Sequence, residues 1–446
     1  MKHIYAQIER NKAWAIETLK KYIALESVSA RRKCLPETAG FLRDTFSRLK
    51  INASIHKAGI APVFCAEHLV KKPAKTLLFY NHYDVQPEDP VGEWFSPPFK
   101  LTERNGLLFG RGTADNKGNL IARLWALKSY LDLGIAPPVN LKFVVEGEEE
   151  SGSESFPAFV KKHRSTLLKA DCCIWESGSK DEKGRPQITL GAKGIIDLEI
   201  SIECAKADMH SSNGVIAPNP AWRLAWALAS LKGSDENILI DGFYDDIVRP
   251  CDEEIAAIRK IPFNEKERRK KAGIKEFLLG LTGRDLVERY YFEPALNING
   301  LTSGYQGEGH KTVLPHKASA KLDFRLVPEQ DPVKIISRLK KHFIAKGFPD
   351  VKINFAHGYS AAMTPVTDPF VKTVSDACRE VYRKEPVINP MMAASTPMYT
   401  LSEYLPIASI GAGHADSNIH GPNESIIIKD FLESAKVIAN IMERLI

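Results

Sequence analysis

Carboxylates crowd the end of one apolar stretch, and this crowding is the first sign of chemistry in the sequence. Residues 141–152 read LKFVVEGEEESG, so a run typical of a buried strand leads into acidic residues and then into Ser-Gly. Charge runs are most often solvated loops. In open α/β sheets, however, ligands bind just outside the carboxyl ends of strands. A cation site there requires that metal-type ligands follow other strands as well.

A histidine and an aspartate two residues apart follow the strand-like run TLLFYN. Residues two apart point to the same side of an extended segment. The Asp84 carboxylate can therefore bond one ring nitrogen of His82 and leave the other nitrogen for a metal. Taken alone, the pair fits a hydrogen-bonded surface histidine equally well.

A glycine-rich loop, LLFGRGTADNKGNL at 107–120, precedes a helical pattern and carries Asp115. Phosphate binding is one interpretation, but the loop lacks both the G-K-[ST] of a P-loop and the G-x-G-x-x-G spacing. A turn-capping role for Asp115 stays open. A carboxylate presented from such a turn also suits a bridge between two metals.

Further candidate ligands follow two later apolar strands. Glu176 ends ADCCIW, and His414 and His420 lie in the loop GAGHADSNIHGPNE. Nitrogen and oxygen ligands without cysteine suit Zn, Mn or Co, whereas oxygen ligands alone suggest Mg or Ca. One bridging aspartate with two further ligands per metal leaves room for a shared water, which is the geometry of a two-metal hydrolase.

The elements that position these residues alternate between strand and helix. This order predicts a mixed, mostly parallel sheet flanked by helices. The expected helices are 1–29, 37–51 and 118–133, and the expected strands are 76–85, 141–149 and 170–178.

From about residue 191 the pattern changes to alternating strands with fewer helices, which predicts a smaller antiparallel sheet with helices on one side. The α/β pattern returns near residue 364. We therefore predict a catalytic domain formed by 1–190 and 363–446, interrupted by an inserted α+β lid and dimerisation domain at 191–362. Within these limits we expect strands 193–205, 311–328, 351–361 and 407–413, helices 220–232, 333–346 and 424–446, and helices with irregular covering segments over 235–300.

Composition excludes several classes of protein. The 446 residues are 44% hydrophobic and 26% charged, with a formal net charge of +6 and scattered basic residues, so we expect no nucleic-acid partner. No run approaches a membrane span, and no signal peptide is expected. The seven cysteines form no disulfide framework or metal clip, which favours the cytoplasm.

Five motifs in order carry a family resemblance: HYDVQP, GRGTADNKG, EGEEESGS, ESG and HGPNE. Together they resemble the dizinc exopeptidase and deacylase family. It includes carnosinase-type dipeptidases, glutamate carboxypeptidases, aminoacylase, acetylornithine deacetylase and succinyl-diaminopimelate desuccinylase. The resemblance implies a zinc-exopeptidase-like catalytic domain and two divalent ions, with Zn expected and Mn or Co as alternatives.

The resemblance also implies a role for each candidate at the metal site. Glu149 would be the general base, and Asp84 would orient His82. The peptide bond after Asp115 would be cis. One metal would take His82, Asp115 and Glu176, and the other Asp115, Glu150 and His420, with Asp115 bridging.

In the inserted domain the motif ADMHSS resembles the family stretch whose histidine, here His210, reaches the active site of the partner subunit and stabilises the oxyanion. A homodimer through the inserted domain follows from this. DFRLVPEQDP resembles the stretch whose arginine, here Arg325, holds the substrate carboxylate, and His357 and Ser395 occupy positions of substrate contacts.

The expected reaction is hydrolysis of an amide bond in dipeptides or at a peptide C-terminus. The alternative is an N-acyl-amino-acid deacylase of the acetylornithine deacetylase or desuccinylase type. Family members with Glu at the position of Glu176 tend to be carboxypeptidases and deacylases, whereas EEESGS and RLVP look closest to carnosinase-like dipeptidases. A binding or scaffold protein would lack a ligand or the base, and this sequence has them all.

Overall fold

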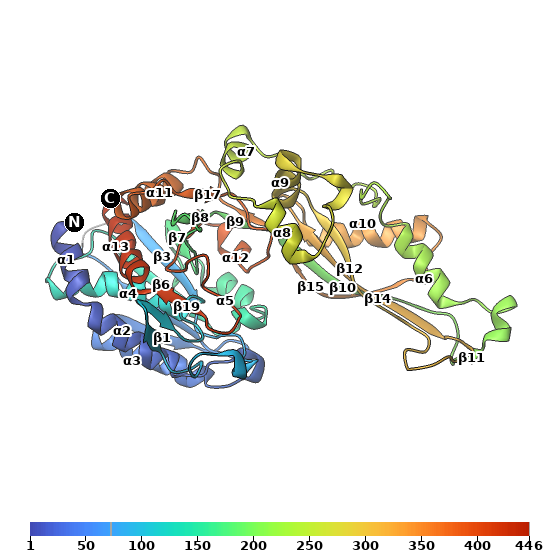
Figure 1. Ribbon diagram of the computed structural model, residues 1–446, viewed down its shortest axis with the longest axis horizontal. Helices are drawn as coiled ribbons and strands as arrows, with labels where there is room; N and C mark the ends of the chain where they lie inside the picture. Colours follow the sequence, from blue (N-terminus) through green and yellow to red (C-terminus); the bar gives the residue numbers. More distant parts are fainter. Residues whose placement is uncertain (72–73, 446) are drawn as a thin grey trace.

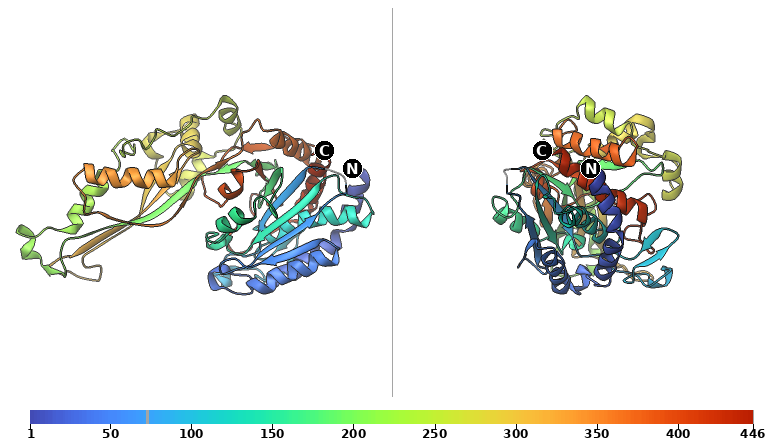
Figure 2. Two further views of the ribbon diagram at one scale, coloured as in Figure 1. Left: turned by 180° about the vertical axis from the view of Figure 1, so that it is seen from behind. Right: turned by 90° about the vertical axis from the view of Figure 1, so that its left-hand side faces the viewer.

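The chain forms two lobes, a larger one and an elongated smaller one (Figure 1). The computed structural model describes residues 1–71 and 74–445. The blue and red segments, from the two ends of the sequence, both lie in the larger lobe, whereas the middle of the chain builds most of the smaller lobe (Figure 1, Figure 2). The smaller lobe is therefore an insertion into the larger one.

An eight-stranded sheet runs through the larger lobe in the order β1-β2-β6-β3-β7-β18-β8-β17. The central pairs β6–β3, β3–β7 and β7–β18 are parallel, as is β8–β17, and the pairs β1–β2, β2–β6 and β18–β8 are antiparallel. The strands are β1 Asn52–His56, β2 Val63–His68, β3 Thr76–His82, β6 Asn140–Glu146, β7 Cys172–Trp175, β8 Gln187–Thr189, β17 Val387–Asn389 and β18 Ile407–Ser409.

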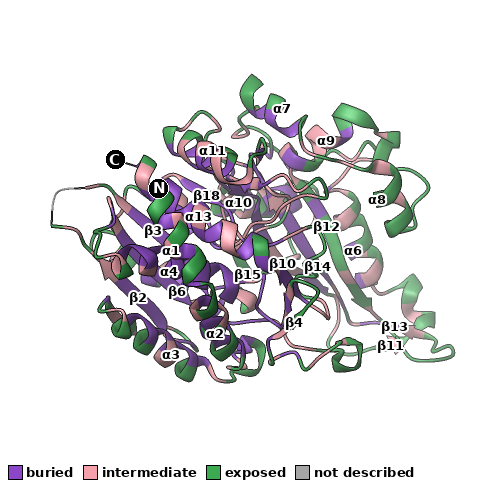
Figure 3. Ribbon diagram, turned by 60° about the vertical axis from the view of Figure 1, so that its left-hand side comes forward, coloured by how far each residue is buried: buried purple, intermediate pink, exposed green. Residues whose placement is uncertain are grey.

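Alternating side chains of the central strands fill two cores. On β3, Leu77 and Phe79 pack into one core, and Leu78 and Tyr80 pack into the core on the opposite face. Because both faces are covered by helices, the central strands read as continuous apolar runs; they are purple in Figure 3. The helices of the first core are α1 Lys2–Arg10, α2 Lys12–Ile23, α3 Leu35–Arg48, α4 Lys117–Asp132, α11 Pro369–Tyr382 and α13 Ile428–Arg444, and those of the second are α5 Phe156–His163 and α12 Tyr399–Ser402.

The smaller lobe is built on a four-stranded antiparallel sheet in the order β12-β14-β10-β15. Along β10 the alternate residues Ile196, Leu198, Ile200 and Ile202 are buried against two helices on one side of the sheet. The expected mixed, mostly parallel sheet with an inserted antiparallel domain is therefore confirmed. The elements are β10 Gly194–Glu203, β12 Ala295–Ser303, β14 Lys317–Leu326, β15 Lys352–Tyr359, α6 Pro220–Ala229 and α10 Pro332–Ala345.

The segment 235–300 contains the expected helices α7 Asp252–Ile258, α8 Glu265–Ala272 and α9 Gly283–Phe292. The expectation of only helices and irregular chain is wrong at its end, because β12 begins at Ala295. The sequence ALNINGLTS has the Asn and Gly residues that strands disfavour. It is accommodated at a sheet edge, mostly exposed, with a bulge between Ile298 and Gly300.

Two expected helices have different limits in the structure. The N-terminal helix is split into α1 and α2 at Asn11, whose side chain donates to Ser129 Oγ and to Asp132 Oδ2 of α4. The expected closing helix starts only at Ile428, because Ser425–Ile427 forms strand β19 beside β5 (Leu107–Phe109). Residue 446 lies outside the described residues.

Two further features concern the cysteines and the helices. All seven cysteines are free thiols. Among the described residues, no helix has both the length and the apolar character that a membrane crossing needs.

Candidate metal centre

The candidate ligands meet at the carboxyl ends of three parallel strands. His82 is the last residue of β3, Glu149 and Glu150 follow β6, and Glu176 follows β7. Because the strands are parallel, their carboxyl ends lie side by side at the same end of the sheet. Asp115 lies near these strand ends on the loop between β5 and α4.

Asp115 lies between two histidines. Its Oδ1 is 3.1 Å from His82 Nε2, and its Oδ2 is 3.2 Å from Nε2 of His420. The same His420 nitrogen is 3.2 Å from Glu150 Oε2, and His82 Nε2 is 3.6 Å from Glu176 Oε2. One aspartate thus offers a separate oxygen to each side of the site, which is the arrangement of a bridging ligand.

Two groups of potential metal ligands have their donor atoms within 4.8 Å of one another: His82, Glu149 and Glu176, and His82, Asp115 and Glu150. Glu149, the expected base, therefore lies among the ligands. His414 lies outside both groups; its Nε2 is 3.3 Å from Ser425 Oγ.

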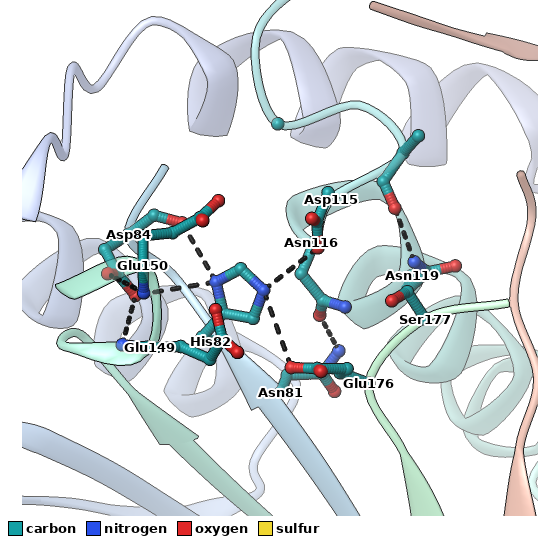
Figure 4. A network of polar contacts seen from close by, with 12 residues as sticks. Asn81, His82, Asp84, Asp115, Asn116, Asn119, Glu149, Glu150, Glu176 and Ser177 are labelled. Atoms are coloured by element: carbon teal, nitrogen blue, oxygen red, sulfur yellow. Dashed lines mark hydrogen bonds and ion pairs between the residues drawn. The ribbon is translucent and has the colours of Figure 1, made fainter. Parts of the chain in front are cut away.

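Asp84 supports both sides of the centre (Figure 4). The Nδ1 atom of His82 is 3.0 Å from the Asp84 carbonyl oxygen and 3.5 Å from its Oδ1. The buried Asp84 carboxylate also accepts the backbone N–H groups of Glu149, at 3.3 Å, and Glu150, at 2.9 Å. It therefore fixes the His82 ring and the turn that carries the two glutamates.

The four glutamates from the end of β6 onward, Glu146, Glu148, Glu149 and Glu150, divide into two kinds. Glu146 is buried, and its Oε1 accepts from the Tyr80 hydroxyl at 2.6 Å and from Ser153 Oγ at 3.0 Å. The carboxylate of Glu148 accepts the backbone N–H groups of Ile60, Ala61 and Ser155. Protein donors hold the Glu148 carboxylate and Oε1 of Glu146, whereas Oε2 of Glu146 is buried and has no hydrogen-bond partner among the described residues. Glu149 and Glu150 are the glutamates of this stretch that lie among the potential metal ligands.

Glu424 holds the glycine loop, and the sequence reasoning missed it. Its buried carboxylate accepts from Arg111 NH1 and from the backbone N–H groups of Gly112, Ala114 and Asp115, at 2.9 to 3.0 Å. The loop amides that could cradle a phosphate are therefore occupied by this carboxylate. The phosphate-binding interpretation is wrong for that reason, and the expected cis bond after Asp115 is present.

Arg123 of α4 is a second residue that the sequence reasoning missed. Its buried guanidinium donates to the carbonyl oxygens of Tyr80, Trp175 and Glu176 and to Asn81 Oδ1. These acceptors lie at the ends of β3 and β7. A single side chain therefore ties together the strand ends that present His82 and Glu176, although no local motif marks it.

The pKa shifts of the clustered carboxylates and His420 indicate that the centre is stabilised by additional positive charge. Burial and the nearby Glu176 raise the pKa of Glu149 well above its usual range, and burial raises the pKa of Glu176 to about 7. Burial opposes ionisation of Asp115, but hydrogen bonds from His420 and His82 hold its pKa below the usual range. Hydrogen bonds to Asp115 and Glu150 raise the pKa of His420 to about 10. A bound cation stabilises the charged carboxylates and takes over the role of these protons.

The residues fit a divalent metal. Glu176 Oε2 is buried and makes no hydrogen bond to any described residue. It faces His82 Nε2 across 3.6 Å, a separation at which one ion can contact both atoms. The donor set of imidazole nitrogens and carboxylate oxygens suits Zn, Mn or Co.

The candidate substrate residues lie on the smaller lobe and at its junction with the larger one. Arg325 NH1 donates to Ser395 Oγ at 2.8 Å, which brings these two together. His357 is more than half exposed, and its Nε2 is 3.0 Å from Asp197 Oδ2. His210 lies on the short strand β11 (Met209–His210) at the far tip of the smaller lobe, so one chain does not bring it to the metal centre (Figure 1).

Comparison with known proteins gives the family. The model of Peptidase family M20/M25/M40 matches residues 78–444. The human Beta-Ala-His dipeptidase is 28% identical, covering 98% of this chain and 91% of its own, and the Cys-Gly metallodipeptidase DUG1 of Saccharomyces cerevisiae is 30% identical, covering 85% and 81%. The M20 family metallo-carboxypeptidase Sso-CP2 from Sulfolobus solfataricus superposes with a TM-score of 0.88 at 38% identity, covering 97% of this chain and 99% of its own. This chain, with its histidine and carboxylate centre at the strand ends, is therefore an enzyme of Peptidase family M20/M25/M40.

Proposed function

We propose that the enzyme hydrolyses an amide bond in dipeptides or at a peptide C-terminus, with Glu149 as the general base. The observation that carries the proposal is the position of Asp115 between His82 and His420, with Glu149 among the same ligand atoms. The similar proteins are two dipeptidases and a metallo-carboxypeptidase, which supports this class of substrate.

The proposed metal ligands are His82, Asp115 and Glu176 for one ion and Asp115, Glu150 and His420 for the other. We propose Zn as the metal, with Mn and Co as alternatives. Two such ions, when bound, lower the pKa of a water molecule and polarise the scissile carbonyl. Asp84 holds the His82 ring in the orientation that aims Nε2 into the site.

Glu149 moves the proton. Its carboxylate accepts a proton from the attacking water and then delivers it to the nitrogen of the leaving amine. The position of the Glu149 carboxylate supports this role, because its donor atom lies within 4.8 Å of the ligand atoms of His82 and Glu176 and is therefore within reach of a water molecule bound there.

Arg325 is the proposed clamp for the substrate carboxylate. A guanidinium can donate two parallel hydrogen bonds to a carboxylate. Ser395 accepts one N–H of Arg325 and donates to the carbonyl oxygen of Gly194, at 3.2 Å, so the clamp is braced from the junction of the lobes. His357 is proposed as a further substrate contact on the same sheet.

We further propose a homodimer through the inserted domain, residues 191–362, in which His210 stabilises the oxyanion in the partner's active site. The distal position of His210 supports this arrangement, since it leaves the side chain remote from the centre of its own chain (Figure 1). Val215, Ile216, Trp222 and Trp226 near this tip are largely exposed, Val215 at 91%, which suits burial in an interface. The expected cytoplasmic location stays a prediction.

The test is release of free amino acid from X–Gly dipeptides, their N-acetylated forms and their C-terminal amides, with metal-free and Zn-loaded protein. We expect metal-dependent cleavage of the free dipeptides or of peptides with a free carboxylate. Preference for the N-acetylated set would replace the proposal by a deacylase. Glu149→Gln should abolish turnover, whereas Glu154→Gln, a nearby exposed glutamate, should not.

A further inference from the structure

Tyr359 lies where the two lobes meet. It is the last residue of β15 in the smaller lobe, and its ring stacks on that of Tyr399, the first residue of α12 in the larger lobe. The ring centroids are 4.8 Å apart and the planes differ by 6°. Each ring covers one face of the other, so the stack fixes the orientation of the Tyr359 phenol at the junction.

The sheet register aligns Tyr359 with the proposed carboxylate clamp. Ile195 of β10 pairs with Tyr359 on one side and with Arg325 of β14 on the other. Side chains in one row across a sheet point to the same face, and adjacent strands lie about 4.8 Å apart, so the Cα atoms of Tyr359 and Arg325 are separated by about 10 Å. The phenol and the guanidinium therefore stand on either side of Ile195.

The Tyr359 phenol is half-buried at the junction of the lobes. Burial raises its pKa, the Glu149 carboxylate raises it further, and the Arg325 guanidinium opposes the rise. None of the hydrogen bonds among described residues uses this hydroxyl, so its O–H is available to a ligand, in contrast to the buried Tyr80 hydroxyl, which donates to Glu146.

Arg325 by itself does not fill all the hydrogen-bond acceptor positions of a substrate carboxylate. Arg325 NH1 already donates to Ser395, and Arg325 Nε lies 3.5 Å from Asp323 Oδ2. A carboxylate has two oxygens with about four acceptor positions. A guanidinium that is engaged in this way fills some of them and leaves others open to a second donor.

We propose that Tyr359 is a further substrate-binding residue, whose hydroxyl donates a hydrogen bond to the C-terminal carboxylate of the substrate beside Arg325, while Tyr399 holds the ring in place. The proposal rests on the proposed function, because it takes Glu149 and Arg325 to mark the two ends of the bound C-terminal residue. The ligand class is a peptide or amino-acid derivative with a free α-carboxylate.

The experiment compares Tyr359→Phe with wild type and with the matched variant Tyr399→Phe. Both variants keep the aromatic stack and remove one hydroxyl. Each protein, Zn-loaded, is assayed with a dipeptide and its C-terminal amide, and calorimetry measures binding of a ketomethylene isostere of the dipeptide, which cannot be cleaved, and of its C-terminal amide.

Tyr359→Phe should raise KM for the dipeptide and Kd for the carboxylate isostere by about 10- to 100-fold, the effect of losing one hydrogen bond to a charged group. It should change kcat little and leave the amides unaffected, and Tyr399→Phe should behave as wild type. Equal affinities of Tyr359→Phe and wild type for the carboxylate isostere would overturn the inference, as would equal losses on carboxylate and amide. A wild-type protein that binds the isostere but cleaves no peptide would overturn the proposed function alone, since the binding comparison still decides the role of Tyr359.

Discussion

Replacing Glu424 by Gln should damage both the fold and the metal site. The two Glu424 oxygens accept four hydrogen bonds: Oε2 from Arg111 NH1 and the Gly112 N–H, and Oε1 from the N–H groups of Ala114 and Asp115. A glutamine has one acceptor oxygen and one NH2 group. In either orientation of the glutamine amide, its NH2 group faces two of these four donors, and both hydrogen bonds are lost.

The magnitude follows from these contacts. Hydrogen bonds to charged groups contribute about 1.5 to 3 kcal/mol each, so losing two should lower the free energy of unfolding by about 3 to 6 kcal/mol. Whole proteins are stable by only about 5 to 15 kcal/mol, so this is a large share. The loop also carries Asp115, and its displacement should weaken zinc binding by about 10- to 100-fold, as for other outer-shell partners of metal ligands.

Urea unfolding of the metal-free protein and zinc competition with a chelator measure the two effects. The control is Glu443→Gln on α13, where the carboxylate accepts from the Tyr130 hydroxyl at 2.9 Å and a glutamine oxygen can accept the same bond. We expect the control to stay within about 1 kcal/mol of wild type. Wild-type stability together with wild-type zinc affinity in Glu424→Gln would refute the reasoning, because the loop would then not depend on this carboxylate.

Three further predictions concern the metal centre and the dimer. Asp84→Asn should weaken zinc binding by about 10- to 100-fold in a chelator competition, since it disturbs the His82 ring and the turn of the glutamates; an unchanged affinity would remove Asp84 from the site. In the folded, metal-free protein the pKa of Glu176 is about 7 and that of His420 about 10, above their ordinary values of 4.5 and 6.5. The folded state therefore holds these protons more tightly than the unfolded state, and the metal-free protein should lose stability as the pH rises from 4.5 to about 7 and from 6.5 to about 10. Zinc affinity should increase over the same range, because the ligands lose the protons that compete with the metal. Thermal unfolding and zinc titration across pH test this, and a metal-free protein that grows more stable over that range contradicts it. Mixing and re-equilibrating inactive His210→Ala and Glu149→Gln subunits should restore about a quarter of wild-type activity, because half of the dimers then hold one intact site; a mixture that stays inactive argues against a contribution of His210 to the partner's site.

The sequence by itself determined the order of the ligands and the elements that carry them. Each of five ligand or base residues follows an apolar run or a glycine turn: His82, Asp115, Glu149, Glu150 and Glu176. These patterns involve only neighbouring residues, so they can be recognised before the fold is known. A parallel sheet then brings the strand ends together. The long helices and the change from a parallel to an antiparallel pattern are local as well, since hydrophobic periodicity is a property of neighbouring residues.

Tertiary structure alone decided which charges the protein itself satisfies. Glu424 meets Arg111 across 313 residues of sequence, and Arg123 ties together the ends of two strands that no motif links to it. Buried charges need partners, but nothing in the local sequence names a partner that is distant along the chain.

The same limit explains the other differences. The break between α1 and α2 depends on the contact of Asn11 with α4, and β12 forms despite a poor strand sequence because β14 offers it an edge. The stack of Tyr359 on Tyr399 exists only because the inserted lobe folds back on the larger one. Packing between segments that are remote in sequence sets these features, and it overrides the local preferences from which elements are predicted.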